Sequence, residues 1–420
     1  MPEPSSARPA TLARVLLPSG SDAGAWRVLA ARGLRALADG YMAVLLPAYL
    51  LALGLGTVEV GVVATTTLLG SALATIAVGA WGHRFAPGAL LRAMAWLMVA
   101  TGVAFAGLTS LWPLLVVAFV GTLNPSAGDV SAFLPLEHAR IAASAGGAAR
   151  TALFARYSVV GALCAALGAL AAGAPEGLER YAGWPRLQAM RAMFLLYAAI
   201  GLGVWWLYRR RAPSQAARAA PLGPSRRIVV RLAALFSVDA FAGGLIVNSL
   251  LTLWLLQRFG LTLAQAGVFF FWTGALSAAS QLAAPAVARR FGLLNTMVFT
   301  HIPANVCLVL AALAPSLPLA LLFVRSALSQ MDVPTRTAFV MAVVTPPERS
   351  AAASFTAVPR SLAAAASPAL AGALLAGGML AAPLVACGAL KIAYDVAIRF
   401  AFRRVPLDEG TQTTSRAGER

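Results

Sequence analysis

The sequence predicts an all-α, polytopic membrane protein with twelve transmembrane helices arranged in two pseudo-symmetric six-helix bundles. Three observations support this prediction: an apolar composition, a series of twelve apolar windows and an internal repeat. Hydrophobic residues make up 60% of the 420 positions and charged residues only 11%. This leaves too little polar surface to cover a soluble protein of that size, so we expect the chain to lie in a lipid bilayer.

The apolar windows give the order of the elements. A helix needs about 20 apolar residues to span the hydrocarbon, and such windows are centred near residues 45, 69, 98, 119, 162, 198, 244, 274, 303, 327, 368 and 390. The one long polar segment separates six windows from the next six. We therefore expect an N-terminal tail, an N-terminal bundle, a linker, a C-terminal bundle and a C-terminal tail, with the boundaries 1–25, 26–208, 209–227, 228–404 and 405–420.

The two groups of windows resemble each other. The spacing of Arg156, Gly168 and Gly173 recurs, shifted by 204 positions (for example 360−156), in the triplet Arg360, Gly372 and Gly377. A shift of 206 relates two further sets, which are His83-Arg84-Phe85 with Arg289-Arg290-Phe291, and Gly54 and Gly61 with Gly260 and Gly267. Two parallel halves are typical of secondary transporters, in which the substrate site lies where the halves meet.

The basic residues report topology. The formal charge is +18, and most arginines fall in alternate loops, whereas the intervening loops carry only Arg180, Arg186, Arg191 and Arg258. This follows the positive-inside rule and predicts that both termini and the linker are cytoplasmic. We expect a bacterial-type cytoplasmic (inner) membrane. The basic linker has no interleaved aromatic residues, which argues against nucleic-acid binding.

Motifs for catalysis or cofactor binding are missing from the sequence. The three cysteines and three histidines lie scattered, without the spacing of a metal site. No nucleophile elbow or phosphate-cradling loop is found. We therefore expect neither an enzyme nor a metal or other cofactor. The alternative is a membrane enzyme that uses His138 beside Glu137.

The basic turns after the second window of each half resemble a known signature. They read Gly79-Ala-Trp-Gly-His-Arg-Phe-Ala-Pro87 and Pro285-Ala-Val-Ala-Arg-Arg-Phe-Gly-Leu293. With the twelve windows and the basic linker, they make the chain similar to the major facilitator superfamily of transporters over its whole length. The resemblance implies that Arg84 and Arg290 belong to a cytoplasmic gate and that the first, fourth, seventh and tenth helices line the path. The signature's Asp is replaced by His83 and Arg289, so a latch here needs other partners.

The fourth and tenth windows contain the most polar intramembrane residues. In the tenth window Arg325, Asp332 and Arg336 are spaced so that one continuous helix would carry all three on one face. In the fourth window Asn124 and Asp129 flank Pro125 and Gly128, which should break the helix and free backbone carbonyls. We assign Asn124, Asp129, Arg325 and Asp332 to the substrate or proton pathway. A structural ion pair between Asp332 and Arg325 is the alternative.

A matched pair of carboxylates lies in the first and seventh windows. Asp39 and Asp239 are related by a shift of 200, and we assign them to coupling or to the cytoplasmic gate. Salt bridges or helix caps are the alternative roles. Lys391 and Asp395 are expected to satisfy each other at i and i+4. Close helix packing is expected at Gly161, Gly168 and Gly372.

Together these features predict a secondary active transporter that moves a small molecule by alternating access, with proton-coupled export preferred and the chain acting as a monomer. Two alternatives stay open. One is uptake or facilitated diffusion of an organic anion drawn to Arg325. The other is a transport-dead membrane scaffold or sensor built on the same fold.

Overall fold

The computed structural model of the chain describes residues 17, 21–22, 24–126, 131–209, 223–314, 317–345 and 348–403. Throughout these residues the regular structure is helical. The expected C-terminal tail, most of the expected N-terminal tail and most of the expected linker lie outside this part, as does Asp129 of the assigned pathway.

The first half of the chain folds into a bundle of α-helices with one short 3₁₀ turn. In chain order these are α2 (Ala25–Ala52), α3 (Thr57–Trp81), η1 (Gly82–Arg84), α4 (Pro87–Gly107), α5 (Leu111–Val120), α6 (Phe133–Ser144), α7 (Gly147–Ala171), α8 (Ala174–Ala182) and α9 (Arg186–Tyr208).

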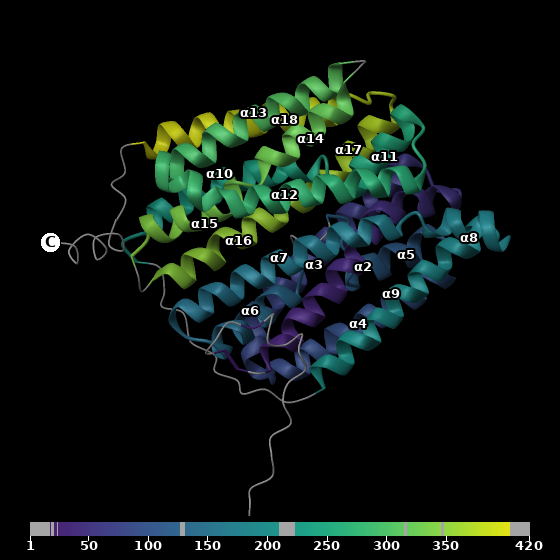
Figure 1. Cartoon of the computed structure of the whole chain (residues 1–420), viewed down its shortest axis with the longest axis horizontal. Helices are drawn as coiled ribbons and strands as arrows, with labels where there is room; N and C mark the ends of the chain where they lie inside the picture. The colour runs from purple at the N-terminus through teal and green to yellow at the C-terminus, as the bar shows by residue number, and fades with distance from the viewer. Residues whose placement is uncertain are drawn as a thin grey trace, which may run out of the picture.

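The second half repeats this plan. It contains α10 (Arg226–Gly244), α11 (Asn248–Phe259), α12 (Leu263–Phe291), α13 (Leu293–Leu313), α14 (Pro318–Ser329), α15 (Asp332–Val343), α16 (Arg349–Ala366), α17 (Pro368–Ala376) and α18 (Ala382–Phe402). In Figure 1 this half, in green to yellow, lies beside the first half, in purple to teal.

The helices form twelve spans. In the described chain nine are long and apolar enough to cross a bilayer, counting α7 with α8, α10 with α11 and α16 with α17 as single spans. The other three are the interrupted pairs α5–α6 and α14–α15, and α18, which carries Lys391, Asp395 and Arg399. The expected fold class is therefore confirmed.

The interruptions follow the local sequence. α5 ends at Val120, where Gly121 takes an extended conformation, and Pro125 then keeps Asn124 from resuming a helix because a proline disfavours the helical conformation of the residue before it. Pro368 begins α17 directly after Ser367, the position at which a helix accepts proline without losing a hydrogen bond. The tenth span breaks at Gln330 and Met331, between α14 and α15.

The outer surface of the bundle is apolar. Trp112 is 79% exposed, and Val116, Leu313 and Phe400 are each more than half exposed. A protein with so many exposed apolar side chains would aggregate in water, whereas the same surface matches the hydrocarbon of a bilayer.

The two ends of the bundle differ. The ends of α2 and α18 nearest the chain termini, η1 and the start of α10 lie at one end, here called the basic end, toward the left of Figure 1; α8, α11 and α17 lie at the opposite or far end. One hydrophobic core joins both halves toward the far end, including Tyr49, Phe105, Trp254 and Leu375. At the basic end the described residues form separate cores within each half. The halves are therefore held together mainly at the far end.

Polar contacts reinforce the far end. The Glu176 carboxylate of α8 accepts hydrogen bonds from the backbone N–H groups of Leu263 (2.6 Å) and Ala264 (3.2 Å), at the start of α12 in the other half. A carboxylate at a helix N-terminus is favoured both by the free N–H groups and by the helix dipole. Thr65 also accepts a hydrogen bond from the Ala369 N–H across the halves, at 2.9 Å.

Glycines allow the closest helix approaches. A Cβ atom on Gly168 of α7 would lie 2.0 Å from the Leu37 carbonyl oxygen of α2, and one on Gly372 would lie 2.9 Å from the Gly61 Cα of α3. At Gly161 the same atom would lie 2.5 Å from the Arg32 guanidinium. Gly168 and Gly372 therefore sit where backbones touch, and Gly161 leaves room for a charged side chain.

Candidate functional site

A buried charge cluster lies in the basic half of the first bundle, here called the Glu137 cluster. The Glu137 carboxylate on α6 is fully buried and accepts hydrogen bonds from Arg35 of α2, from Tyr157 of α7 at 2.5 Å and from Tyr208 of α9. The Arg35 guanidinium also lies over the Phe133 ring, 4.1 Å from its centroid. Side chains from α2, α7 and α9 therefore converge on a single carboxylate on α6.

A second buried charge cluster, here called the Asp239 cluster, lies in the C-terminal bundle. Asp239 of α10 accepts from Lys391 of α18 at 2.5 Å and from Arg336 of α15 at 3.0 Å. Arg336 in turn lies 3.2 Å from Asp332, one turn earlier on α15. The charges balance, with two carboxylates against two cations.

A histidine–carboxylate pair lies beside this cluster. His301 Nδ1 of α13 is 2.9 Å from Asp395 of α18, and both side chains are buried. The Tyr394 ring meets the imidazole edge-on at 6.3 Å between centroids.

The two clusters have inverted polarity. In the first half the cation, Arg35, is on the first span and the anion, Glu137, is on the fourth. In the second half the anion, Asp239, is on the equivalent first span and the cation, Arg336, is on the equivalent fourth. Each half thus ties its first and fourth spans together by a buried ion pair.

Asp39 differs from Asp239 in its contacts. It lies at the middle of α2 with only 5% of its surface exposed, yet within the described residues its carboxylate has no ion pair or hydrogen bond. Arg32 and Arg35 act on it electrostatically from the preceding turns, and Glu137 opposes them. The repeat therefore places two aspartates in equivalent helices, one doubly paired and one without a contacting cation.

The break in the fourth span contains Asn124. Its buried amide oxygen accepts from the Ser126 N–H at 3.0 Å and from the Ser126 hydroxyl at 2.7 Å, which shapes the turn. The carbonyl of Pro125, freed by the break, accepts the Ser249 N–H of the other half at 3.1 Å. This carbonyl is therefore already hydrogen-bonded to the start of α11, just after the break between α10 and α11 in the opposite half.

Arg325 lies apart from Asp332. It belongs to α14, and its guanidinium Nε is buried without a hydrogen-bond partner in the described part of the chain. The expected common face of Arg325, Asp332 and Arg336 is therefore wrong, because the helix is interrupted at Gln330 and Met331. Asp332 and Arg336 do share a face of α15.

Arg84 and Arg290 are both exposed at the basic end, and the Arg290 guanidinium lies over the Phe291 ring at 5.5 Å. In the described residues neither forms an ion pair within 4.0 Å. This conformation therefore shows no latch between the two turns.

The structure corrects one expected pairing and adds residues. Lys391 and Asp395 do not satisfy each other, because Lys391 binds Asp239 and Asp395 binds His301, each on another helix. The sequence interpretation also missed the role of Arg35, Tyr157 and Tyr208. An arginine one turn before Asp39 in an apolar window was the available signal for Arg35, whereas the tyrosines gave none.

Two six-helix halves, joined at one end and each carrying buried charges on its first and fourth spans, define the class of a secondary transporter. The family model described as Major Facilitator Superfamily matches residues 28–330. The chain belongs to that superfamily, and the resemblance seen in the sequence is confirmed.

Individual proteins are similar over most of the chain. The "Uncharacterized membrane protein YJR124C" of Saccharomyces cerevisiae is 24% identical over 414 residues, which cover 88% of this chain and 92% of that protein. The crystal structure of the nucleoside transporter NupG matches with a TM-score of 0.69 at 14% identity, covering 90% of this chain and 99% of that one. The inward-open xylose transporter XylE from E. coli matches at 0.68 and 15% identity, covering 92% and 98%. At these identities the structural likeness shows the fold alone.

Proposed function

We propose that this protein exports a small molecule by alternating access and that protons moving inward drive the export. The observation that carries the proposal is Asp39, a buried carboxylate at the middle of the first span without a contacting cation. Burying an ionised carboxylate without a partner is costly, and the cost becomes much smaller when the group takes up a proton. Asp39 is therefore the group best placed to bind and release a proton during the transport cycle.

The paired carboxylates suit a different role. Neutralising Asp239 would leave Lys391 and Arg336 buried with unbalanced charge, which opposes its protonation. We assign Asp239 to holding the C-terminal bundle together, and Asp39 to coupling.

The basic loops give the proposed orientation of the protein in the membrane. We place the basic end, with both termini, in the cytoplasm of a bacterial-type cell by the positive-inside rule. The far end, where the common core and the Glu176 contacts join the halves, then faces outward. In this arrangement the path is closed on the outside, and the chain works as a monomer without a cofactor.

The substrate is proposed to bind between the halves, near the broken fourth and tenth spans. Asn124, Asp129, Arg325 and Asp332 remain our assignments for this region. Broken helices at the midplane supply polar backbone where an apolar helix would offer none. Arg84 and Arg290 are assigned to the cytoplasmic gate, which would form when the basic ends of the halves approach.

The proposal is tested in two steps. A panel of metabolites and drugs is first screened for ligands that raise the thermal stability of the purified full chain, because a ligand bound by the folded state stabilises it. The hit is then followed in inverted vesicles with an acidic interior, where wild type should accumulate it. Asp39→Asn should bind the ligand but lose gradient-driven accumulation, whereas Asp395→Asn, a buried carboxylate paired with His301 outside the assigned pathway, is the control that keeps it. Equal accumulation by wild type and Asp39→Asn would rule out Asp39 as the coupling group.

A second candidate function is uptake or facilitated diffusion of an organic anion. It is favoured by Arg325, whose buried Nε lacks a partner in the described residues and which is not neutralised by Asp332. An anionic hit whose uptake survives an uncoupler, and is lost in Arg325→Gln, would support this alternative over export.

A further inference from the structure

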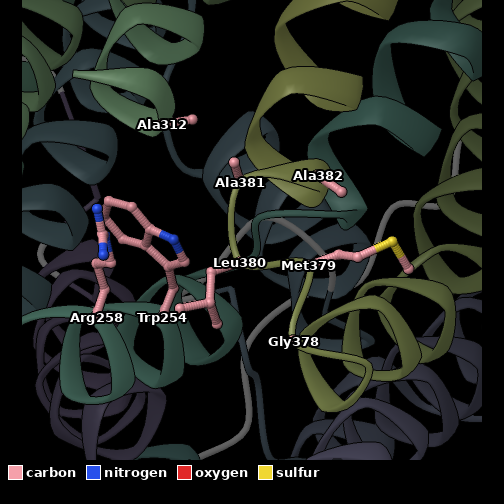
Figure 2. Close-up of a pocket in the computed structure, with 8 residues that line it drawn as sticks. All are labelled: Trp254, Arg258, Ala312, Gly378, Met379, Leu380, Ala381 and Ala382. Carbon is pink, nitrogen blue, oxygen red and sulfur yellow. The ribbon is translucent and has the colours of Figure 1, made fainter. Parts of the chain in front are cut away.

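A pocket at the far end of the C-terminal bundle lies away from both charge clusters. Its volume is about 460 Å³, within the range of small-ligand sites. The last turns of α11 and α13, the turn after α17 and the start of α18 form its walls (Figure 2). Its lining comes entirely from the C-terminal half, so the pocket is separate from the path between the halves.

The polar side chains of the pocket are both hydrogen-bond donors. Trp254 is 1% exposed, and its indole Nε1 has no hydrogen-bond partner in the described residues. Arg258 lies one turn later on the same face of α11 and extends beside the indole in Figure 2. Indole and guanidinium groups donate and cannot accept. These two side chains therefore supply no acceptor to the pocket, and the buried indole N–H without a partner is costly.

The charge of the pocket is positive. In the described lining no carboxylate accompanies Arg258, and Arg258 forms no ion pair within 4.0 Å in the described chain. The start of α18 brings the positive end of its dipole to the pocket, whereas α11 and α13 bring their negative ends, so Arg258 is the one full positive charge among the described lining residues. The guanidinium therefore sets the sign, and it binds oxyanions through paired N–H groups.

The rest of the lining is apolar. Ala312, Met379, Leu380 and Ala382 face the same space. Met379 is itself 52% exposed, and outside the pocket Leu313 is 64% and Leu317 is 62% exposed. Apolar side chains exposed at the end of a membrane bundle mark the boundary between hydrocarbon and water.

We propose that this pocket binds an amphiphilic phosphate, with the phosphate oxygens on Trp254 Nε1–H and the Arg258 guanidinium and the attached apolar chain along Met379 and Leu380. A phospholipid headgroup and a soluble alkyl phosphate share this chemistry. The exposed apolar rim favours the lipid.

The test measures binding to the purified full chain in neutral detergent by calorimetry. The probes are dihexanoyl phosphatidylglycerol and hexyl phosphate, with dihexanoylglycerol as the uncharged control. We expect binding of at least one phosphate probe and none of the control. Tighter binding of the phosphatidylglycerol identifies a lipid site, and tighter binding of hexyl phosphate identifies a site for a soluble ligand.

Two variants address the donors. Arg258→Gln should raise the Kd by about tenfold or more, because charge-assisted hydrogen bonds to phosphate are lost. Trp254→Phe keeps the aromatic bulk and should raise the Kd by roughly threefold to tenfold. If Arg258→Gln does not fold, Arg258→Lys keeps the charge without the planar fork and should still weaken binding by about threefold.

Matched control variants distinguish binding in the pocket from a general attraction of the anionic probes to a basic protein. Arg180 occupies the last turn of α8 before the left-handed Gly183, just as Arg258 occupies the last turn of α11 before the left-handed Gly260. Trp112 is a lipid-exposed tryptophan outside the pocket. Arg180→Gln and Trp112→Phe should leave the Kd within about twofold. The proposal is overturned if neither phosphate probe binds wild type, if the pocket variants bind as wild type does, or if Arg180→Gln weakens binding as much as Arg258→Gln.

Discussion

Removing the carboxylate of the Glu137 cluster should destabilise the protein strongly. Glu137 is fully buried and accepts hydrogen bonds from Arg35, Tyr157 and Tyr208, so Glu137→Leu leaves the Arg35 charge and two phenol groups without an acceptor. Breaking a buried ion pair costs about 3–5 kcal/mol. For a cooperative unit the size of one half, even 3 kcal/mol lowers the melting temperature by roughly 6–12 °C.

A second substitution in the same cluster should restore much of the lost stability. Replacing both charges in Arg35→Met/Glu137→Leu removes the stranded cation, and apolar replacements of buried ion pairs are often close to neutral. The double variant should therefore melt higher than Glu137→Leu alone. Unfolding can be followed by the loss of helical circular dichroism on heating the purified protein in detergent. A loss below about 1 kcal/mol in Glu137→Leu, or a double variant no more stable than the single, would refute the buried-pair explanation.

Three further predictions use the same melting assay or its variants. Gly168→Ala should destabilise by about 1–3 kcal/mol because its methyl group meets backbone, whereas Gly79→Ala, with open space around it, should be neutral or slightly stabilising. Glu176→Gln weakens the contact between the halves at the far end. Cysteines introduced on both halves at that end should therefore react faster with a thiol reagent than the same cysteines without this substitution. An unchanged labelling rate would contradict the role of Glu176 in holding the far end closed. Hydrogen bonding, from Ser225 foremost, lowers the pKa of Glu348 at the start of α16. Its stabilisation is thus present above the ordinary pKa of 4.5 and lost on acidification, and the melting advantage of wild type over Glu348→Gln should shrink as the pH falls below that value.

The sequence supplied the fold because its signals are local and repeated. Apolar windows and basic loops are readable one segment at a time, and the repeat confirmed their grouping. Pro125 also marks one helix interruption correctly, since proline acts on its own backbone. The interruption at Gln330 and Met331 has no proline at the break. The sequence therefore predicted one continuous helix, with Arg325 and Asp332 on a shared face, and that prediction was wrong.

The charge clusters were predictable only in part. Asp39, Asp239 and Asp332 stand out as charges in apolar windows, and the structure finds all three buried. Their partners come from helices far apart in sequence, and spacing along one helix says nothing about them. Lys391 and Asp395 illustrate this: the i, i+4 rule is satisfied, yet each side chain turns to a partner on a neighbouring helix. The difference between Asp39 and Asp239 is likewise a property of tertiary packing.

The central claim is that inward proton movement drives the substrate outward. It is tested most directly in proteoliposomes that hold the identified substrate on one side and a pH-sensitive dye inside, with no imposed pH gradient. The account predicts that a substrate gradient drives protons in the opposite direction to the substrate and that Asp39→Asn moves none. Substrate flux with no proton movement, or with protons in the same direction, would contradict it.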